Sequence, residues 1–186
     1  VSPDESGISR AMYYASMLGV PLGTFYRIMD YEQKTEGSPP VIAYEYLGES
    51  VEGKNIIIVD DMIVTGDSML DVACELRKRK AGRIFIVSTY GLFTEGIERF
   101  SRAYEDGIFD RVFSTNLIYR RPELLASPWF VDVDMSKYVS LIIDALNHDA
   151  SLSRLMDPTE KIRLLLEREQ NLGTFFKPSA DGSPSP

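Results

Sequence analysis

The sequence is poor in cysteine and histidine, and it carries fewer basic than acidic residues. One cysteine, Cys74, and one histidine, His148, occur among 186 residues. An internal disulfide framework and a cysteine-rich zinc site are therefore excluded. A single cysteine fits a reducing compartment, so we expect a cytoplasmic protein.

The excess of acidic residues bears on the partners of the protein. Lys and Arg number 20 against 28 Asp and Glu, which gives a formal net charge of −8. This balance argues against sequence-independent binding of nucleic acid and against a polybasic membrane anchor. No apolar run approaches the ~20 residues of a membrane-spanning helix, and no signal peptide is visible. We expect neither a nucleic-acid partner nor a membrane partner.

The length fits one domain with a sizeable core. Strand and helix patterns alternate along it. Apolar spacing predicts helices over residues 8–18, 68–80, 94–104, 135–146 and 157–169. Short β-branched or alternating runs predict strands over residues 20–26, 41–47, 55–59, 84–89, 112–113 and 130–133. Repeated strand–helix units predict an α/β fold with a parallel sheet and helices on both faces.

Local signals add detail at the ends of these elements. Ser68 is expected to cap the helix over 68–80, and Asp157 followed by Pro158 is typical of a helix start. Residues 30–40 are polar and end in two prolines, so they are predicted to form a loop. The Pro/Ser/Gly-rich end of the chain is predicted to be disordered.

The chemistry concentrates in residues 55–71, which read N-I-I-I-V-D-D-M-I-V-T-G-D-S-M-L-D. A buried strand delivers Asp60 and Asp61 to its carboxyl end, where open α/β sheets bind ligands. A loop with hydroxyls at Thr65 and Ser68 follows, and then a helix begins. Backbone N–H groups of the loop and of the first helical turn have no intrahelical partner, so they form a site for an anion such as phosphate.

The acid pair restricts the ligand further. Two carboxylates repel a bare phosphate, so the ligand must also present hydroxyls or a Mg²⁺ ion. A phosphorylated sugar meets both requirements. The alternative, a solvated Asp pair before an ordinary helix, fits an isolated Asp-Asp but leaves the rest of the string unexplained.

The string I-I-I-V-D-D-M-I-V-T-G-D-S-M resembles the ribose-phosphate-binding signature of type I phosphoribosyltransferases and ribose-phosphate pyrophosphokinases. A second segment, V-S-P-D-E-S-G at residues 1–7, resembles the pyrophosphokinase loop that binds pyrophosphate or the ATP phosphates. Weaker matches follow in order at residues 88–93, 115–116, 131–135 and 147–148. Together they are similar to the C-terminal half of a two-domain pyrophosphokinase.

This resemblance implies a domain organisation. Residues 1–156 would form a phosphoribosyltransferase-like (Rossmann-like) domain, residues 157–172 a C-terminal helix and residues 173–186 a disordered tail. The chain does not begin with Met, and the resemblance implies an N-terminal domain that is absent from it. In the family, that domain of a neighbouring subunit shares the adenine site. We therefore expect a homo-oligomer in which this chain alone is catalytically poor.

The resemblance also implies an activity and its residues. The intact enzyme would transfer diphosphate from ATP to ribose 5-phosphate, giving phosphoribosyl pyrophosphate, with Mg²⁺ as cofactor. It implies catalytic roles for Arg27, Asp60 and Asp61, and metal binding by Asp4, Asp60 and Asp61. The implied substrate-binding residues are Asp4, Ser6, Gly7, Ile63, Val64, Thr65, Gly66, Asp67 and Ser68.

Two departures from the family pattern bear on activity. Where the family has a Lys and an Arg separated by one residue, this chain has Arg27 and the uncharged Met29. Where the family has a second glycine in T-G-G-T, this chain has Asp67. A carboxylate there repels phosphate, so either its side chain points away or the affinity falls.

Other functions stay open. A phosphoribosyltransferase that uses phosphoribosyl pyrophosphate shares residues 55–71 but not the S-P-D start. A non-catalytic regulatory or scaffold protein of pyrophosphokinase ancestry is favoured by Met29 and Asp67. A receiver domain also places acids after a strand, but residues 84–89 offer neither the phosphoacceptor Asp nor the Lys expected of it.

Overall fold

The computed structural model describes residues 1–29 and 41–175, and the chain divides into two units, residues 1–139 and residues 140–186. The predicted loop over residues 30–40 and the predicted tail beyond residue 175 lie outside the described residues.

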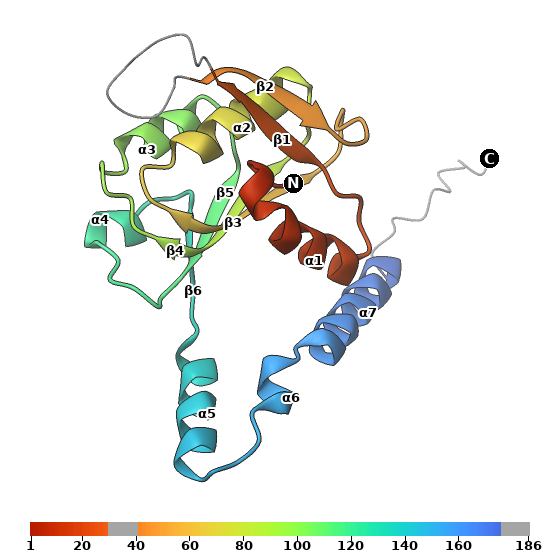
Figure 1. Cartoon of the computed structure of the whole chain (residues 1–186), viewed down its shortest axis with the longest axis vertical. Helices are drawn as coiled ribbons and strands as arrows, with labels where there is room; N and C mark the ends of the chain where they lie inside the picture. Colours follow the sequence, from red (N-terminus) through yellow and green to blue (C-terminus); the bar gives the residue numbers. More distant parts are fainter. Residues whose placement is uncertain (30–40, 176–186) are drawn as a thin grey trace, which may run out of the picture. The chain divides into compact units, whose positions relative to one another are not determined.

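The first unit is built on a four-stranded parallel sheet (Figure 1). In spatial order its strands are β3 (Ile56–Ile63), β4 (Ile84–Gly91), β5 (Arg111–Thr115) and β6 (Phe130–Val133). The register places Ile58 beside Ile86, and Ile86 beside Val112. All three side chains are fully buried, as expected for β-branched runs in the middle of a parallel sheet. The predicted parallel α/β sheet is confirmed.

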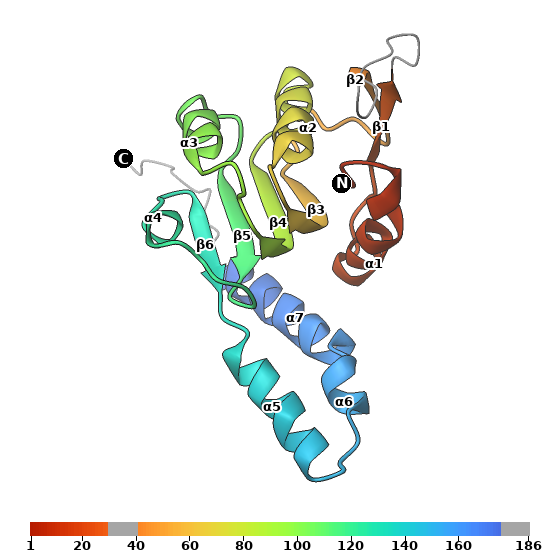
Figure 2. The same ribbon diagram turned by 60° about the vertical axis from the view of Figure 1, so that its left-hand side comes forward.

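Helices cover both faces of this sheet (Figures 1 and 2). On one face lie α2 (Asp67–Lys78) and α3 (Glu98–Glu105), and on the other lies α1 (Ile8–Leu18). Val72, Ala73 and Leu76 of α2 are completely buried, which matches the apolar stripe in the sequence. The predicted α1 is confirmed, including its end at Gly19 in the left-handed conformation.

An aromatic cluster holds α3 against the sheet. Phe100 stacks on Trp129 with ring centroids 5.5 Å apart, and it meets Phe93 edge-on at 5.0 Å. Phe109 completes the group at 6.0 Å from Phe100. All four rings are at most 2% exposed. Such offset and edge-on aromatic contacts add to the free energy of burial, so the start of α3 is held firmly.

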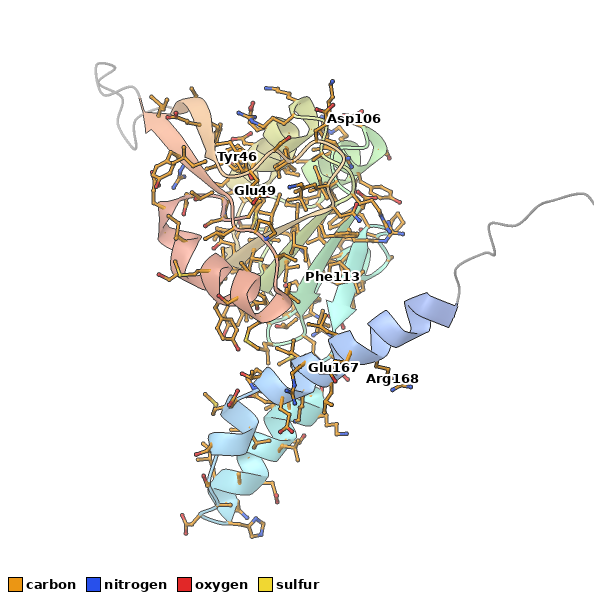
Figure 3. The ribbon with its side chains drawn as sticks, turned by 90° about the vertical axis from the view of Figure 1, so that its right-hand side faces the viewer. Tyr46, Glu49, Asp106, Phe113, Glu167 and Arg168 are labelled. Atoms are coloured by element: carbon orange, nitrogen blue, oxygen red, sulfur yellow. The ribbon has the colours of Figure 1, made fainter. Side chains whose placement is uncertain are left out.

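A separate antiparallel hairpin consists of β1 (Thr24–Met29) and β2 (Val41–Leu47). Aromatic rings pack between its own two strands, and a hydroxyl group joins it to α2. The ring of Tyr46, labelled in Figure 3, lies 5.1 Å from that of the buried Phe25. The hydroxyl of Tyr44 donates a 2.9 Å hydrogen bond to Asp71 in α2. The hairpin is therefore held both by aromatic packing and by a polar contact.

Residues 1–2 lie between the hairpin and the main sheet. On one side, the nitrogen of Val1 donates to Ile57 and the nitrogen of Val59 donates to Val1, at 2.7 and 3.1 Å. On the other side, Ser2 forms a parallel bridge with Thr24 of β1. This short segment thus runs parallel to both β3 and β1, and all three point toward the same edge.

Some predicted boundaries are wrong for local reasons. The strand expected over residues 20–26 runs instead from Thr24 to Met29, because Pro21 lacks the N–H that strand pairing needs. The helix expected from Thr94 begins only at Glu98, because Gly96 adopts a φ of +91° in a turn. Ser68 does not cap α2, which begins at Asp67 after Gly66.

Three short helices were not predicted from the sequence. They are the 3₁₀ helix η1 (Glu5–Gly7), α4 (Pro122–Leu125) and α6 (Ser153–Met156). The other C-terminal helices are α5 (Ser136–Asn147) and α7 (Thr159–Phe175), the latter longer than predicted. Asp157 accepts a 3.0 Å hydrogen bond from the nitrogen of Thr159, as its capping position predicts. No helix in the described ranges is long and apolar enough to cross a membrane.

Arg77 of α2 joins the helix to the chain segments that precede β4 and β5. Its guanidinium donates to the carbonyls of Ile108 and Ala81 at 3.0 and 3.2 Å, and pairs with Asp110 at 3.1 Å. Asp110 in turn accepts a 2.8 Å hydrogen bond from the nitrogen of Ile84, where β4 begins. Arg77 therefore fixes several otherwise unpaired polar groups.

We expect Arg77→Met to lower the free energy of unfolding by about 2–3 kcal/mol, because it leaves partly buried carbonyls without a donor and removes one of the charged partners of Asp110. Lys78→Met is the matched control, since the Lys78 side chain is 71% exposed. It is expected to change stability by less than about 0.5 kcal/mol. Urea unfolding followed by circular dichroism measures both, and equal midpoints for the two variants would contradict the role assigned to Arg77.

Candidate functional site

The parallel direction of three neighbouring segments assembles the candidate site. Asp4 follows the pairing of residues 1–2, Arg27 lies near the end of β1, and Asp60 and Asp61 lie near the end of β3. Each of these residues is therefore carried toward the carboxyl edge of its segment, where ligands of α/β sheets bind. The acid pair lies inside β3 rather than after it, since Asp60 pairs in register with Ser88 of β4.

Asp4 and Arg27 are brought into direct contact. One carboxylate oxygen of Asp4 accepts from the nitrogen and hydroxyl of Ser6, at 2.9 and 2.6 Å. The other oxygen accepts from Arg27 at 2.7 Å, and the Asp4 side chain is only 13% exposed. A Cβ at Gly7 would lie 2.6 Å from the hydroxyl oxygen of Ser2, so a larger residue there would force the Ser2 side chain to move. Residues 4–7, which the resemblance assigns to diphosphate binding, are thus joined by an ion pair to Arg27.

Arg10 of α1 bridges the acid pair. Its two terminal nitrogens lie 2.7 Å from Asp60 and 2.9 Å from Asp61. Asp60 also accepts a 2.8 Å hydrogen bond from the nitrogen of Asp61. Burial raises the pKa of the Asp60 carboxyl despite the nearby guanidinium. Arg10 was not predicted from the sequence. Its position in the helix that begins just after Asp4 could have indicated that it lies near the same edge of the sheet.

The candidate phosphate loop, residues 63–68, is fixed by the segment that follows β4. The carbonyl of Val64 accepts from both the nitrogen and the hydroxyl of Thr94, at 2.9 and 3.1 Å. The carbonyl of Ile63 accepts from the nitrogen of Leu92 at 2.8 Å. Ile63 is buried, whereas Val64 is 46% exposed. The loop therefore has a defined backbone, which an anion site built on N–H groups needs.

Gly66 is the turning point of this loop. It adopts a φ of +91°, which side chains other than glycine rarely tolerate. A Cβ at this position would also overlap the ring of Phe100, the central member of the aromatic cluster. Two independent constraints, backbone conformation and core packing, therefore require glycine here.

Asp67 is directed back into the loop. Its carboxylate accepts a 2.9 Å hydrogen bond from the hydroxyl of Thr65 and a further one from Arg99 of α3. The predicted alternative of a side chain pointing away is therefore not realised. Arg99 is a second residue that sequence reasoning missed, because no local pattern connects position 99 with position 67.

The remaining predicted residues contribute in different ways. Ser68 lies half-buried in the first turn of α2, while Ser6 is exposed on η1. In the described part of the chain, no three His, Cys, Asp or Glu side chains come together to hold a metal ion. Mg²⁺ commonly takes most of its ligands from water and substrate oxygens. Asp60 and Asp61 could supply oxygen ligands to such an ion, although both carboxylates are paired with Arg10 in this structure.

A cavity of about 500 Å³ beside α1 lies apart from these groups. Ala11, Ala15 and Leu18 line it from α1, and Ile57 and Val59 from β3. Its lining is mostly apolar and includes none of the predicted site residues. Size alone would favour it, but the charged and hydrogen-bonding groups that a phosphorylated ligand needs are at the sheet edge.

Comparisons with known proteins agree with the family resemblance of residues 1–7 and 55–71. The family model described as phosphoribosyl transferase domain matches residues 1–119. The chain is 32% identical over 156 residues to a ribose-phosphate pyrophosphokinase of Mycoplasma pneumoniae, covering 83% of this chain and 45% of that protein. It is 37% identical over 107 residues to the ribose-phosphate pyrophosphokinase of Pyrococcus abyssi, covering 57% of this chain and 35% of that protein.

The fold has a match among solved structures. The crystal structure of phosphoribosylpyrophosphate synthetase from Mycobacterium smegmatis superimposes with a TM-score of 0.65 at 23% identity. The match covers 80% of this chain and 44% of that one. At this identity the likeness shows the fold alone. The chain spans less than half the length of each of these curated relatives.

We expect Gly66→Ala to lower the free energy of unfolding by about 2–5 kcal/mol, from left-handed strain together with the overlap with Phe100. Gly53→Ala is the matched control, because Gly53 also has a positive φ, +70°, but has open space around its Cβ position. It is expected to cost about 1–2 kcal/mol. Urea unfolding compares the two, and similar losses would show that the Phe100 contact does not constrain the loop.

Proposed function

Because the chain belongs to the phosphoribosyl transferase domain family, we propose that it binds ribose 5-phosphate as the C-terminal part of a ribose-phosphate pyrophosphokinase. Both relatives compared above carry that name. The S-P-D segment at residues 2–4 also favours a pyrophosphokinase over a phosphoribosyltransferase, whose signature covers only residues 55–71.

One observation carries this proposal. The carboxylates of Asp60 and Asp61 lie in the second half of β3, and the loop of residues 63–68 begins two residues after Asp61. The carboxylates accept hydrogen bonds from sugar hydroxyls, and the N–H groups of the loop donate to phosphate. Ribose 5-phosphate presents hydroxyls and a phosphate at opposite ends of a small ring, so one molecule would engage both.

The proposed reaction joins a diphosphate to the sugar. The anomeric hydroxyl of ribose 5-phosphate loses its proton, and its oxygen forms a bond to the β-phosphorus of ATP. The bond between that phosphorus and the oxygen it shares with the α-phosphate breaks, so phosphoribosyl pyrophosphate and AMP leave. Catalysis of such a transfer rests mainly on positioning and on stabilisation of charge.

The residues divide between the two substrates. Asp60 and Asp61 would orient the ribose hydroxyls, while the backbone of residues 63–68 with the hydroxyls of Thr65 and Ser68 would hold the 5-phosphate. Residues 4–7 would face the diphosphate. Arg27, which pairs with Asp4 at 2.7 Å, would stabilise negative charge on the transferred group.

The cofactor and assembly belong to the same proposal. Mg²⁺ would neutralise charge on the ATP phosphates. Asp4 and the Asp60–Asp61 pair, which do not form one cluster in the described part of the chain, would each supply oxygen ligands beside those of substrate and water. ATP and ribose 5-phosphate would be the substrates and phosphoribosyl pyrophosphate the product. We propose a cytoplasmic homo-oligomer, in line with the single cysteine and with the shared adenine site that the resemblance implies.

A non-catalytic regulatory or scaffold role is the second candidate. It is favoured by Asp67, whose carboxylate takes the hydroxyl of Thr65 that a phosphate would use. Such a protein would keep the fold and its assembly contacts but show no turnover.

We expect calorimetric titration of this chain with ribose 5-phosphate, with and without Mg²⁺, to show saturable binding. Asp60→Asn with Asp61→Asn should weaken it by roughly a hundredfold or more, because hydrogen bonds to charged groups contribute about 1.5–3 kcal/mol each. The control removes two negative charges elsewhere, with Glu105→Gln and Asp106→Asn. These two residues lie at the C-terminal end of α3, where Asp106 is labelled in Figure 3.

Two results would contradict the proposal. Unchanged affinity in the Asp60/Asp61 variant would show that the sugar binds elsewhere. No binding by the folded wild-type chain at millimolar ligand would favour the scaffold role. Where binding is found, assay of AMP formation from ATP by the full-length protein tests turnover.

A further inference from the structure

The phosphate loop holds its own carboxylate. The hydroxyl of Thr65 donates to one oxygen of Asp67 at 2.9 Å, and Arg99 donates to the other oxygen. A phosphate oxygen accepts from the same kinds of donor, hydroxyl and guanidinium. Asp67 therefore occupies, from within the chain, two donors that a bound phosphate would use.

Arg99 is fixed beside the loop independently of Asp67. Its neighbour Phe100 is fully buried in the aromatic cluster, against the site of Gly66. The segment before α3 is hydrogen-bonded to the loop through Thr94 and Val64. Loss of the Asp67 carboxylate would thus leave the backbone of Arg99 in place, with its guanidinium available to another anion.

The Asp67–Arg99 pair is open to solvent and to ligands. The side chains are 47% and 49% exposed, respectively. Ion pairs this exposed contribute little to stability, so they exchange readily for another partner. Glu95 lies 3.9 Å from Arg99 and offers a second, weaker anionic contact.

From these contacts we propose that Asp67 is an internal competitor for phosphate in this loop, and that Arg99 transfers from Asp67 to the phosphate when a ligand binds. The inference rests on the proposed function, since it concerns the same loop. It makes Asp67 an affinity-setting residue and Arg99 a phosphate-binding residue.

The first test is titration of the chain with inorganic phosphate and with ribose 5-phosphate, comparing wild type with Asp67→Asn. Asparagine keeps the size of the side chain but removes the charge that repels phosphate and holds Arg99. We expect about tenfold tighter binding of both ligands. Glu98→Gln is the control, because it removes one negative charge from the position next to Arg99, and we expect less than a twofold change.

The second test separates a phosphate-binding arginine from one that only neutralises Asp67. Arg99→Gln is introduced into the Asp67→Asn variant, where there is no charge left to neutralise. If Arg99 meets the phosphate, affinity falls by about tenfold relative to Asp67→Asn alone. Equal affinity in the single and double variants would overturn the role of Arg99.

The outcomes distinguish this inference from the proposed function. Tighter binding of inorganic phosphate by Asp67→Asn supports the inference even where no variant binds the sugar phosphate. Wild-type binding of ribose 5-phosphate that depends on Asp60 and Asp61 but is unchanged in Asp67→Asn overturns the inference and leaves the function standing. Failure of the wild type and of every variant to bind either inorganic phosphate or ribose 5-phosphate overturns both the inference and the proposed function.

Discussion

The parallel pairing of residues 1–2 with both β3 and β1 is the constraint on which the site depends. Only four backbone hydrogen bonds join this segment to its neighbours. Because the three segments share one direction, Asp4, Arg27 and the acid pair of β3 emerge at the same edge. An antiparallel arrangement of either neighbour would place its polar residues at the opposite edge, more than a strand length away.

The electrostatics of this edge follow from arginines that arrive from separate elements. Arg27 on β1 meets Asp4, Arg10 on α1 meets Asp60 and Asp61, and Arg99 on α3 meets Asp67. Three guanidinium groups thus face four carboxylates, which leaves one excess negative charge among them. From the sequence alone, carboxylates beside the candidate phosphate loop are expected to repel a phosphate. The arginines offset most of that repulsion. The acids are present, but most of their charge is compensated within the protein.

Local sequence patterns predicted the architecture well, and long-range contacts poorly. The apolar stripe of α2 and three of the four residues Ile56–Val59 are buried, so apolar patterning found both elements, although Ile57 is 38% exposed. The turn before α3 was missed because the positive φ of Gly96 is a backbone choice that periodicity does not encode. Arg10 and Arg99 were missed for another reason. Each pairs with a carboxylate at least 32 positions away, a contact that exists only after folding.

The contact between Gly66 and the ring of Phe100 links two parts of the molecule that would otherwise evolve separately. Position 66 belongs to the candidate phosphate loop, whereas position 100 belongs to the aromatic core. A larger residue at 66 would overlap the ring at 100, so the core adds a constraint to the one that the left-handed backbone already imposes. The bulk of Phe100 therefore constrains the loop motif independently of any ligand. Presence of this motif in a related protein would be weaker evidence for ligand binding than presence of Asp60 and Asp61.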